Sequence, residues 1–256
     1  MSTSGPESAR RVPCLSIVLP AWNEDAGLLH TLDAVGAAAD ALVAAGEVGR
    51  VEVVVVDDGS TDATPALLAA RAASDQRLQV VTHDRNRGLG AGVRSGLAKS
   101  TGDVVLYTDA DLPFDLAAVP TALEAVRGGP AGMVALYRVD RAGEGLRRLV
   151  YSYVYNLLVR AVLGVRVRDV NFAGKFLVRD LVDALELHSE GSFIDAEMVA
   201  RAERLGFGVA QFGVEYFPRS RGVSTLSSLP VVLGMLREMR TLTPGIRSLG
   251  PRPGRR

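Results

Sequence analysis

The stretch VVVVDDGSTDAT, residues 53–64, decides the fold of this chain of 256 residues. Four consecutive valines predict a short strand buried on both faces, which is typical of a parallel sheet covered by helices. Two adjacent aspartates, Asp57 and Asp58, follow the valines, and a turn then leads into a helical pattern. Helix capping accounts for the segment 59–64. It does not account for the two aspartates, because adjacent carboxylates repel each other unless a positive or hydrogen-donating group lies between them.

A second stretch, VVLYTDADLPF at 104–114, also ends an apolar run in two aspartates, Asp109 and Asp111. The polar loop PAWNE, 20–24, follows another predicted strand. Ligands of open α/β sheets bind beyond the carboxyl ends of the strands, so we expect these three loops to meet at one edge. In an extended loop the Asp-x-Asp spacing lets both carboxylates face one hard cation. Such an ion could bridge a diphosphate and stabilise it as a leaving group.

The alternation of short apolar runs and helical patterns predicts an α/β fold with a mostly parallel central sheet flanked by helices. The segment VRDVNFAGKFLV, 167–178, receives no assignment. Strands are expected at 15–19, 51–56, 78–82, 104–107 and 133–137, with strand-like segments around 209–217. Helices are expected at 25–45, 63–74, 91–100, 115–126, 146–163, 180–187, 194–205 and 229–242.

Composition excludes several classes of protein. The formal net charge is zero, so there is no global electrostatic case for a nucleic-acid partner. The single cysteine, Cys14, excludes an intrachain disulfide and favours the cytosol. The N-terminal segment lacks the apolar core of a signal peptide, and no apolar run is long enough for a membrane-spanning helix. We therefore expect a cytoplasmic protein, with peripheral contact at the inner face of the cell membrane as a hypothesis.

Other candidate sites are weak. GLGAG, 88–92, follows a strand but lacks the later acidic partner of a dinucleotide-binding fingerprint, so we interpret it as a helix N-terminus that needs room. The chain has no Walker-type phosphate loop. The histidines, His30, His83 and His188, lie far apart in the sequence without metal-ligand spacing.

In order and spacing, PAWNE, VVVVDDGSTDAT, NRGLGAG and YTDADL resemble the family-2 glycosyltransferases of GT-A fold, over residues 15–226. The resemblance is strongest to dolichyl-phosphate mannosyltransferase-like enzymes, which pass a sugar from a nucleotide donor to a polyprenyl phosphate. It implies one GT-A domain over 14–228, with a nucleotide-sugar half at 14–137 and an acceptor half at 138–228. We expect disordered tails at 1–13 and 244–256, and an amphipathic helix at 229–243.

The resemblance also implies a donor site and a metal site. A P-x-N-E-type loop packs around the base and ribose, the Asp-x-Asp motif holds Mg²⁺ or Mn²⁺ through Asp109 and Asp111, and Arg219 closes over the diphosphate. Two departures affect details: Pro113 stands where some relatives have a further metal ligand, and Ser224-Thr225 stands where many have Ser-Lys. The donor-site residues are Pro20, Trp22, Glu24, Val56, Asp58, Asp109, Ala110, Asp111 and Arg219.

On the acceptor side, Arg138 follows the fifth strand, and Arg148 and Ser152 lie four residues apart on one face of the next helix. In the polyprenyl-phosphate enzymes that the chain resembles, residues at such positions bind the acceptor phosphate. The alternative is that Arg147 and Arg148 only solvate the start of a helix.

The implied chemistry is a direct displacement that inverts the anomeric carbon. A phosphate monoester has a second pKa of about 6, so it needs positioning and no strong base. A hydroxyl acceptor needs a general base, for which Asp195 and Glu197 are the candidates. Asp169 matches a motif that faces the sugar, and the alternative for it is an ion pair with Arg166 or Arg168.

Three functions stay open. The first is transfer of a sugar from a nucleotide-diphosphate donor to a lipid phosphate of the polyprenyl type. The second keeps the fold and uses a saccharide or small-molecule hydroxyl, as in synthesis of cell-envelope polysaccharide. The third is a non-catalytic nucleotide-sugar-binding domain. The apolar stretch 149–165 and the helix at 229–242 are candidates for contact with a membrane surface, although such stretches are also typical of protein core.

Overall fold

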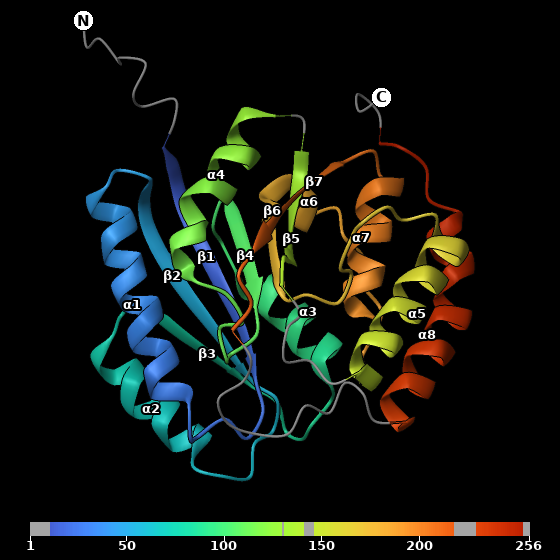
Figure 1. The fold of residues 1–256 in the computed structure, drawn as a ribbon. Coiled ribbons are helices and arrows are strands. Elements are labelled where there is room, and N and C mark those ends of the chain that lie inside the picture. Colours follow the sequence, from blue (N-terminus) through green and yellow to red (C-terminus); the bar gives the residue numbers. More distant parts are fainter. Residues whose placement is uncertain (1–10, 130, 141–145, 218–228, 253–256) are drawn as a thin grey trace, which may run out of the picture.

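A computed structural model of the chain describes residues 11–129, 131–140, 146–217 and 229–252 (Figure 1). Within these ranges the strands form one seven-stranded sheet with the order β3-β2-β1-β4-β6-β5-β7. Neighbouring strands are parallel except that β6 is antiparallel to both β4 and β5. The expected mostly parallel sheet is therefore confirmed. The strands are β1 (Val12–Ala21), β2 (Val48–Asp57), β3 (Leu78–Thr82), β4 (Val104–Thr108), β5 (Ala131–Arg138), β6 (Gly174–Val178) and β7 (Gly208–Val214).

Helices cover both faces of the sheet (Figure 1). Residues of α1, α2 and α4 share one buried cluster with the sheet, and residues of α3, α5, α7 and α8 share the other. The helices are α1 (Leu28–Ala44), α2 (Thr64–Ser74), α3 (Leu89–Lys99), the 3-10 turn η2 (Leu116–Ala118), α4 (Val119–Gly128), α5 (Leu146–Leu163), α6 (Arg179–Val182), α7 (Ile194–Arg204) and α8 (Leu229–Arg247).

The valine run that opens the deciding stretch is buried on both faces, as predicted. Val53 and Val55 belong to the cluster under α1, whereas Val54 and Val56 belong to the cluster under α3. This division follows from the two-residue period of a strand, which sends successive side chains to opposite faces. All four are at most 5% exposed.

Strand β6 was not predicted. It is only five residues long, and it begins with a glycine and a lysine, which are uncommon in buried strands. Lys175 nevertheless pairs with Tyr107 of β4 and Ala135 of β5 and is 1% exposed. The helix expected at 180–187 is also shorter than predicted: regular helix extends only over Arg179–Val182.

The expected C-terminal tail was wrong over the part that the structure describes. Helix α8 continues through Pro244 to Arg247, and the Arg252 N–H donates to Leu205 O at 3.2 Å. Proline interrupts a helix locally, but Ile246 is fully buried, and this packing outweighs the local cost. At the other end β1 begins at Val12, inside the expected tail of 1–13, and residues 1–10 lie outside the described ranges. The division into halves at residues 137 and 138 stays a prediction.

Candidate functional site

The loops that follow β1 and β2 hold each other by side-chain hydrogen bonds. Asn23, with a left-handed φ of 53°, is central, because its N–H donates to a side chain and its side chain accepts from a backbone N–H. The polar residues of the deciding stretch therefore fix the PAWNE loop by hydrogen bonds. Trp22 in this loop is 47% exposed. The bonds are Asn23 N–H to Ser60 Oγ at 2.9 Å, Thr61 N–H to Asn23 Oδ1 at 2.8 Å, Glu24 N–H to Thr64 Oγ1 at 2.9 Å and Asp25 N–H to Asp62 Oδ2 at 3.1 Å.

Hydrogen-bond donors from the protein resolve the repulsion between the adjacent aspartates. Asp57 accepts from Ser60 N–H at 2.9 Å, within its own turn. Asp58, 4% exposed, accepts from His83 Nδ1 at 2.6 Å and from the N–H groups of Arg87 and Gly88 at 2.9 and 2.8 Å. The Asp58 carboxylate thus ties the end of β2 to the loop after β3. Its predicted contact with the nucleoside stays a prediction.

His83 was missed as a site residue, because its partner is 25 positions away in the chain. Its ring is buried between Asp58 and α3, where Nε2 lies 2.8 Å from Ser95 Oγ. An ionised carboxylate only accepts, so the ring proton on Nδ1 faces Asp58. A histidine directly after a short predicted strand was the available signal, but nothing in the sequence pointed to its partner.

The glycines at the start of α3 admit the chain around residues 189–190. Gly88 has a left-handed φ of 95°, and a Cβ at Gly90 would lie 2.3 Å from Ser189 O. The N–H groups of Gly90 and Ala91 donate to Glu190 O at 2.8 and 3.3 Å. The first helical N–H groups are therefore used by a protein carbonyl. The interpretation of GLGAG as a helix start that needs room is confirmed.

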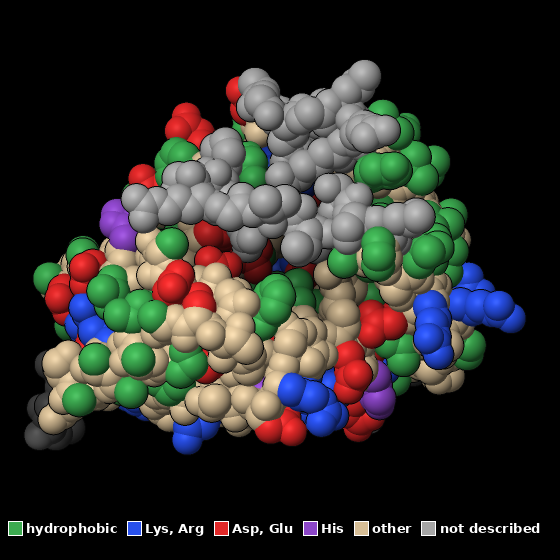
Figure 2. Space-filling view, turned by 90° about the horizontal axis from the view of Figure 1, so that it is seen from below, with side chains coloured by type: hydrophobic (Ala, Val, Ile, Leu, Met, Phe, Trp, Pro, Cys, Tyr) green, Lys and Arg blue, Asp and Glu red, His purple; other side chains and the backbone are tan. Residues whose placement is uncertain are grey.

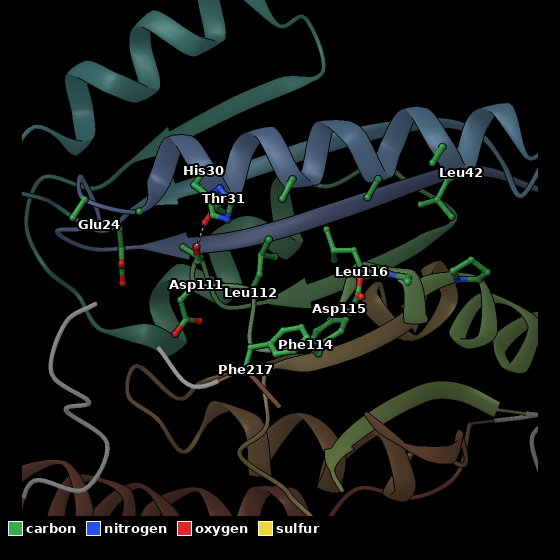
Figure 3. A pocket seen from close by; sticks show the side chains of 18 of the residues that line it. Glu24, His30, Thr31, Leu42, Asp111, Leu112, Phe114, Asp115, Leu116 and Phe217 are labelled. Carbon is green, nitrogen blue, oxygen red and sulfur yellow. Dashed lines mark hydrogen bonds between the residues drawn. The ribbon is translucent and has the colours of Figure 1, made fainter. Parts of the chain in front are cut away.

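A groove of about 880 Å³ lies between α1 and the chain from Ala110 to Pro120 (Figure 3). Glu24 and Asp111, from two different loops, line it near the N-terminal end of α1. Thr31 of α1 donates to Ala110 O at 2.5 Å and fixes the Asp-x-Asp turn to this helix. Further along, one wall is a stripe of alanines on α1 and at its C-cap: Ala34, Ala38, Ala41 and Ala45.

Acidic groups concentrate at the Asp-x-Asp loop. Burial raises the pKa of Tyr107 well above its usual value, and the charges of Asp195, Asp109 and Asp111 raise it further. Within the described ranges, no three His, Cys, Asp or Glu side chains gather into a preformed metal site. The two carboxylates of the motif have the oxygen ligands that Mg²⁺ and Mn²⁺ prefer. They fit an open site, in which a bound diphosphate would complete the coordination.

On the acceptor side the structure joins two predicted residues that the sequence treated separately. Arg138 donates to Asp169 from Nε at 2.7 Å and from a terminal nitrogen at 3.1 Å, and both side chains are at most 8% exposed. The suggested partners of Asp169, Arg166 and Arg168, were therefore wrong. Arg168 instead donates to Tyr137 Oη at 3.2 Å.

The remaining acceptor-side predictions are only partly described. Ser152 lies half-buried on α5, and its backbone oxygen accepts from the Asn156 side chain at 2.8 Å. Asn156 in turn accepts from Val170 N–H at 3.1 Å, which links α5 to the segment that carries Asp169. The side chain of Arg148 and the whole of Arg219 lie outside the described residues.

The two candidate bases have different surroundings. Glu197 is fully buried and accepts from the N–H groups of His188 and Ser189 at 3.0 and 2.7 Å and from Arg201 Nε at 2.8 Å. These contacts hold the loop that packs on Gly88 and Gly90. Asp195, 3% exposed, instead forms an ion pair with Lys175. Burial raises the pKa of Asp195, and the charge of Lys175 opposes that rise.

Comparisons with known sequences agree with these features. The model of the family described as "Glycosyl transferase family 2" matches residues 16–185. Glycosyltransferase AglD of Haloferax volcanii is 32% identical over 226 residues, which are 86% of this chain and 35% of that protein. An undecaprenyl-phosphate 4-deoxy-4-formamido-L-arabinose transferase of Pseudomonas fluorescens is 33% identical, over 68% of this chain and 49% of that protein. The chain thus spans about a third to a half of the length of these curated relatives.

Solved structures show the same fold. Glucosyl-3-phosphoglycerate synthase of Mycobacterium tuberculosis, in complex with Mn²⁺, UDP-glucose and phosphoglyceric acid, superimposes with a TM-score of 0.67 at 25% identity. The match covers 91% of this chain and 82% of that one. A second complex of that synthase, with phosphoglyceric acid, covers 96% of this chain with a TM-score of 0.67 at 24% identity.

We expect Asp58→Ala to lower the free energy of unfolding by about 3 kcal/mol, because the buried ring of His83 and the part-buried N–H groups of Arg87 and Gly88 lose their acceptor, at roughly 1–3 kcal/mol for each buried group left unsatisfied. Urea denaturation measures the change. The matched control is Asp84→Ala in the loop after β3 that Asp58 holds, where the side chain is 75% exposed and pairs with Arg85 at 3.5 Å. Equal losses in the two variants would contradict the role of Asp58 as the tie between the loops.

Proposed function

The chain belongs to glycosyl transferase family 2, and we propose that it moves a sugar from a nucleotide-diphosphate donor to a polyprenyl phosphate, with inversion at the anomeric carbon. The observation that carries this proposal is the position of Arg138. Asp169 holds this arginine in one orientation at the end of β5. The segment that carries Asp169 is hydrogen-bonded to α5 through Val170 and Asn156, and α5 exposes an apolar surface. An oriented guanidinium next to an apolar surface suits an acceptor with a phosphate head and a lipid tail. The relative that is named for undecaprenyl phosphate supports the same acceptor class.

Donor binding is assigned to the edge where β1, β2 and β4 end. Trp22 offers an exposed ring face to the base, and Glu24 and Asp111 line the adjoining groove. Asp109 and Asp111 would hold Mg²⁺ or Mn²⁺, which neutralises the diphosphate and stabilises the departing nucleoside diphosphate. The Mn²⁺ and UDP-glucose in the complex of the mycobacterial synthase support this assignment.

In the proposed reaction a phosphate oxygen of the acceptor forms the new bond to the anomeric carbon. The bond from that carbon to the donor diphosphate breaks on the opposite face, and the nucleoside diphosphate leaves with the electron pair. Because a phosphate monoester is largely dianionic at neutral pH, with a second pKa of about 6, Arg138 has only to position it. A hydroxyl acceptor would need a base. Of the two candidates we favour Asp195, since Glu197 already accepts from three groups of the protein.

The test of the function is an assay with radiolabelled UDP-sugars and GDP-sugars, Mg²⁺ or Mn²⁺, and two acceptors in parallel: undecaprenyl phosphate and 3-phosphoglycerate. We expect the label to become extractable into organic solvent with the lipid acceptor. Label in a water-soluble product alone would favour a small-molecule acceptor. Binding of the nucleotide-sugar without any transfer would favour a non-catalytic domain.

Asp111→Asn should lower turnover at least tenfold, because the variant loses one of the two charges that hold the metal ion. Measuring the rate at increasing Mn²⁺ concentrations distinguishes a weaker affinity for the metal ion from a slower chemical step at saturating metal. Asp115→Asn is the matched control, because this carboxylate lies four residues further on and accepts from Ala117 N–H at 2.8 Å. If Asp111→Asn keeps the rate of the wild type, the metal ion has no part in the reaction.

Contact with a membrane surface is the second part of the proposal. Helices α5 and α8 pack together and both begin at the edge of the sheet that carries the site (Figure 1). Hydrophobic side chains gather over this side of the molecule (Figure 2). We call them the apolar patch: Val150, Tyr151, Tyr153, Val154 and Leu157 of α5, and Leu233 and Leu236 of α8.

Arginines follow the apolar patch along both helices. Arg160 on α5 and Arg237, Arg240 and Arg247 on α8 are exposed. An apolar surface with arginines beside it suits an anionic bilayer, which attracts each nearby basic residue by about 1 kcal/mol. None of the described helices is long and apolar enough to cross a bilayer.

The double variant Tyr153→Glu, Leu157→Glu should bind vesicles of phosphatidylglycerol at least tenfold more weakly at low salt, as measured by sedimentation. The control is Val43→Glu on α1, where the side chain is also exposed. Wild-type protein that ignores such vesicles would refute the surface contact and leave the transfer reaction untouched.

A further inference from the structure

Lys175 is a buried cation to which neither the sequence nor the comparisons assigned a role. It is 1% exposed, on a strand between two others. The chain has 29 basic residues, and Lys99 and Lys175 are its only lysines. Burial of an ammonium group is unfavourable unless the group is paired and hydrogen-bonded. The presence of a lysine at this buried position, in a chain whose basic residues are nearly all arginine, therefore needs a physical explanation.

The contacts of Lys175 show what the ammonium group does. Its Nζ forms an ion pair with Asp195, donates to Phe172 O at 2.8 Å, and lies 5.7 Å from the centre of the Tyr107 ring. An ammonium is a compact point charge, whereas a guanidinium is a planar fork that needs more room. The space between a ring, a carbonyl and a carboxylate suits the smaller group.

The ion pair lies directly behind the Asp-x-Asp loop. Because β6 is antiparallel to β4, Lys175 stands opposite Tyr107, which is two residues before Asp109. Helix α7 leads into β7, which is parallel to β5, so α7 begins at the same edge of the sheet. Asp195 is the second residue of α7 and is brought to that edge.

The groups that face Asp195 come from four elements. They are Lys175 of β6, Tyr107 of β4, Tyr155 of α5 and, from the segment before β6, Asp169, whose own charge is balanced by Arg138. The hydroxyls of both tyrosines are buried and have no hydrogen-bond partner among the described residues. Buried hydroxyls without partners are rare in folded proteins. A ligand rich in hydroxyl groups could satisfy them.

We propose that Lys175 is a positioning residue for sugar transfer: its ion pair with Asp195 orients this carboxylate so that it accepts a hydrogen bond from a hydroxyl of the donor sugar. The inference rests on the proposed function and deepens it, because it names the side of the site that recognises the sugar. Asp195 is then the group that touches substrate, and Lys175 acts through it. A merely structural ion pair is the competing explanation.

Steady-state kinetics with saturating acceptor separate the two explanations. Lys175→Met and Asp195→Asn should each lower kcat at least tenfold, and the double variant should be no slower than Asp195→Asn alone, because both changes remove one interaction. Lys99→Met, an exposed lysine in the last turn of α3, is the matched control and should match the wild type. If the pair is only structural, the double variant, which is neutral at both positions, regains the rate of the wild type, and the proposal is overturned.

Thermal unfolding across pH tests the link without any substrate. Lys175 opposes the rise that burial gives to the pKa of Asp195, so in Lys175→Met this pKa is higher than in the wild type. A group whose folded-state pKa is raised adds stability below its unfolded pKa, about 3.9 for Asp, and loses it as pH rises through the folded value. The Tm of Lys175→Met should therefore fall further below that of the wild type as the pH rises from about 4 to 8. For the double variant this dependence should disappear.

The outcomes keep the two proposals apart. If wild-type protein transfers no sugar to any acceptor, the proposed function fails, and the Tm series still tests the charge on Asp195. If the wild type is active and Lys175→Met has the same kcat, only the inference fails. A difference in Tm that does not change with pH also overturns it. If Lys175→Met does not fold, the kcat of the double variant is compared with that of Asp195→Asn instead.

Discussion

The site depends on one buried carboxylate, that of Asp58, which the surrounding chain satisfies with hydrogen bonds. It accepts from His83, Arg87 and Gly88, so the end of β2 is fixed to the loop after β3. The loops after β1 and β2 hold each other through Asn23 and its partners. Three loops at the carboxyl edge of the sheet are thereby set in place before any ligand arrives. Preorganisation of this kind lowers the ordering cost of binding and positions a group for displacement.

Much of this architecture was readable from local pattern. The run from Val53 to Val56 predicted a strand buried on both faces, and the loops after the first, second and fourth strands predicted an edge with polar groups. What the pattern could not give was the partner of each carboxylate. Asp58 and His83 are 25 residues apart, and Arg138 and Asp169 are 31 apart. Side-chain pairing over such distances is decided by tertiary packing, on which a single sequence carries no direct signal.

The elements that sequence analysis missed share a physical cause. Strand β6 carries Lys175, whose charge normally indicates a surface position, and only its pairing with Asp195 makes burial tolerable. The end of α8 contains Pro244, which normally ends a helix, and only the burial of Ile246 carries the helix past it. In both places tertiary contacts override a local preference. Both lie in the second half of the chain, where the regular alternation of strands and helices has ended.

The charges of the side chains at the carboxyl edge bear on the order in which the metal ion and the donor would bind in the proposed reaction. Asp109, Asp111 and Asp195 all raise the pKa of Tyr107, so three acidic groups act on one buried side chain at this edge, where the proposed diphosphate would bring further negative charge. Like charges at close range repel by more inside a protein than in water, because the effective dielectric constant is lower. In the proposed reaction a divalent ion would therefore enter before the donor or with it. The proposed acceptor phosphate would meet the opposite charge, because Asp169 holds the guanidinium of Arg138 in a fixed orientation. Lys175 forms an ion pair with the third acidic group, Asp195, so in the proposed reaction the metal ion would be held by the two carboxylates of the Asp-x-Asp motif and not by Asp195.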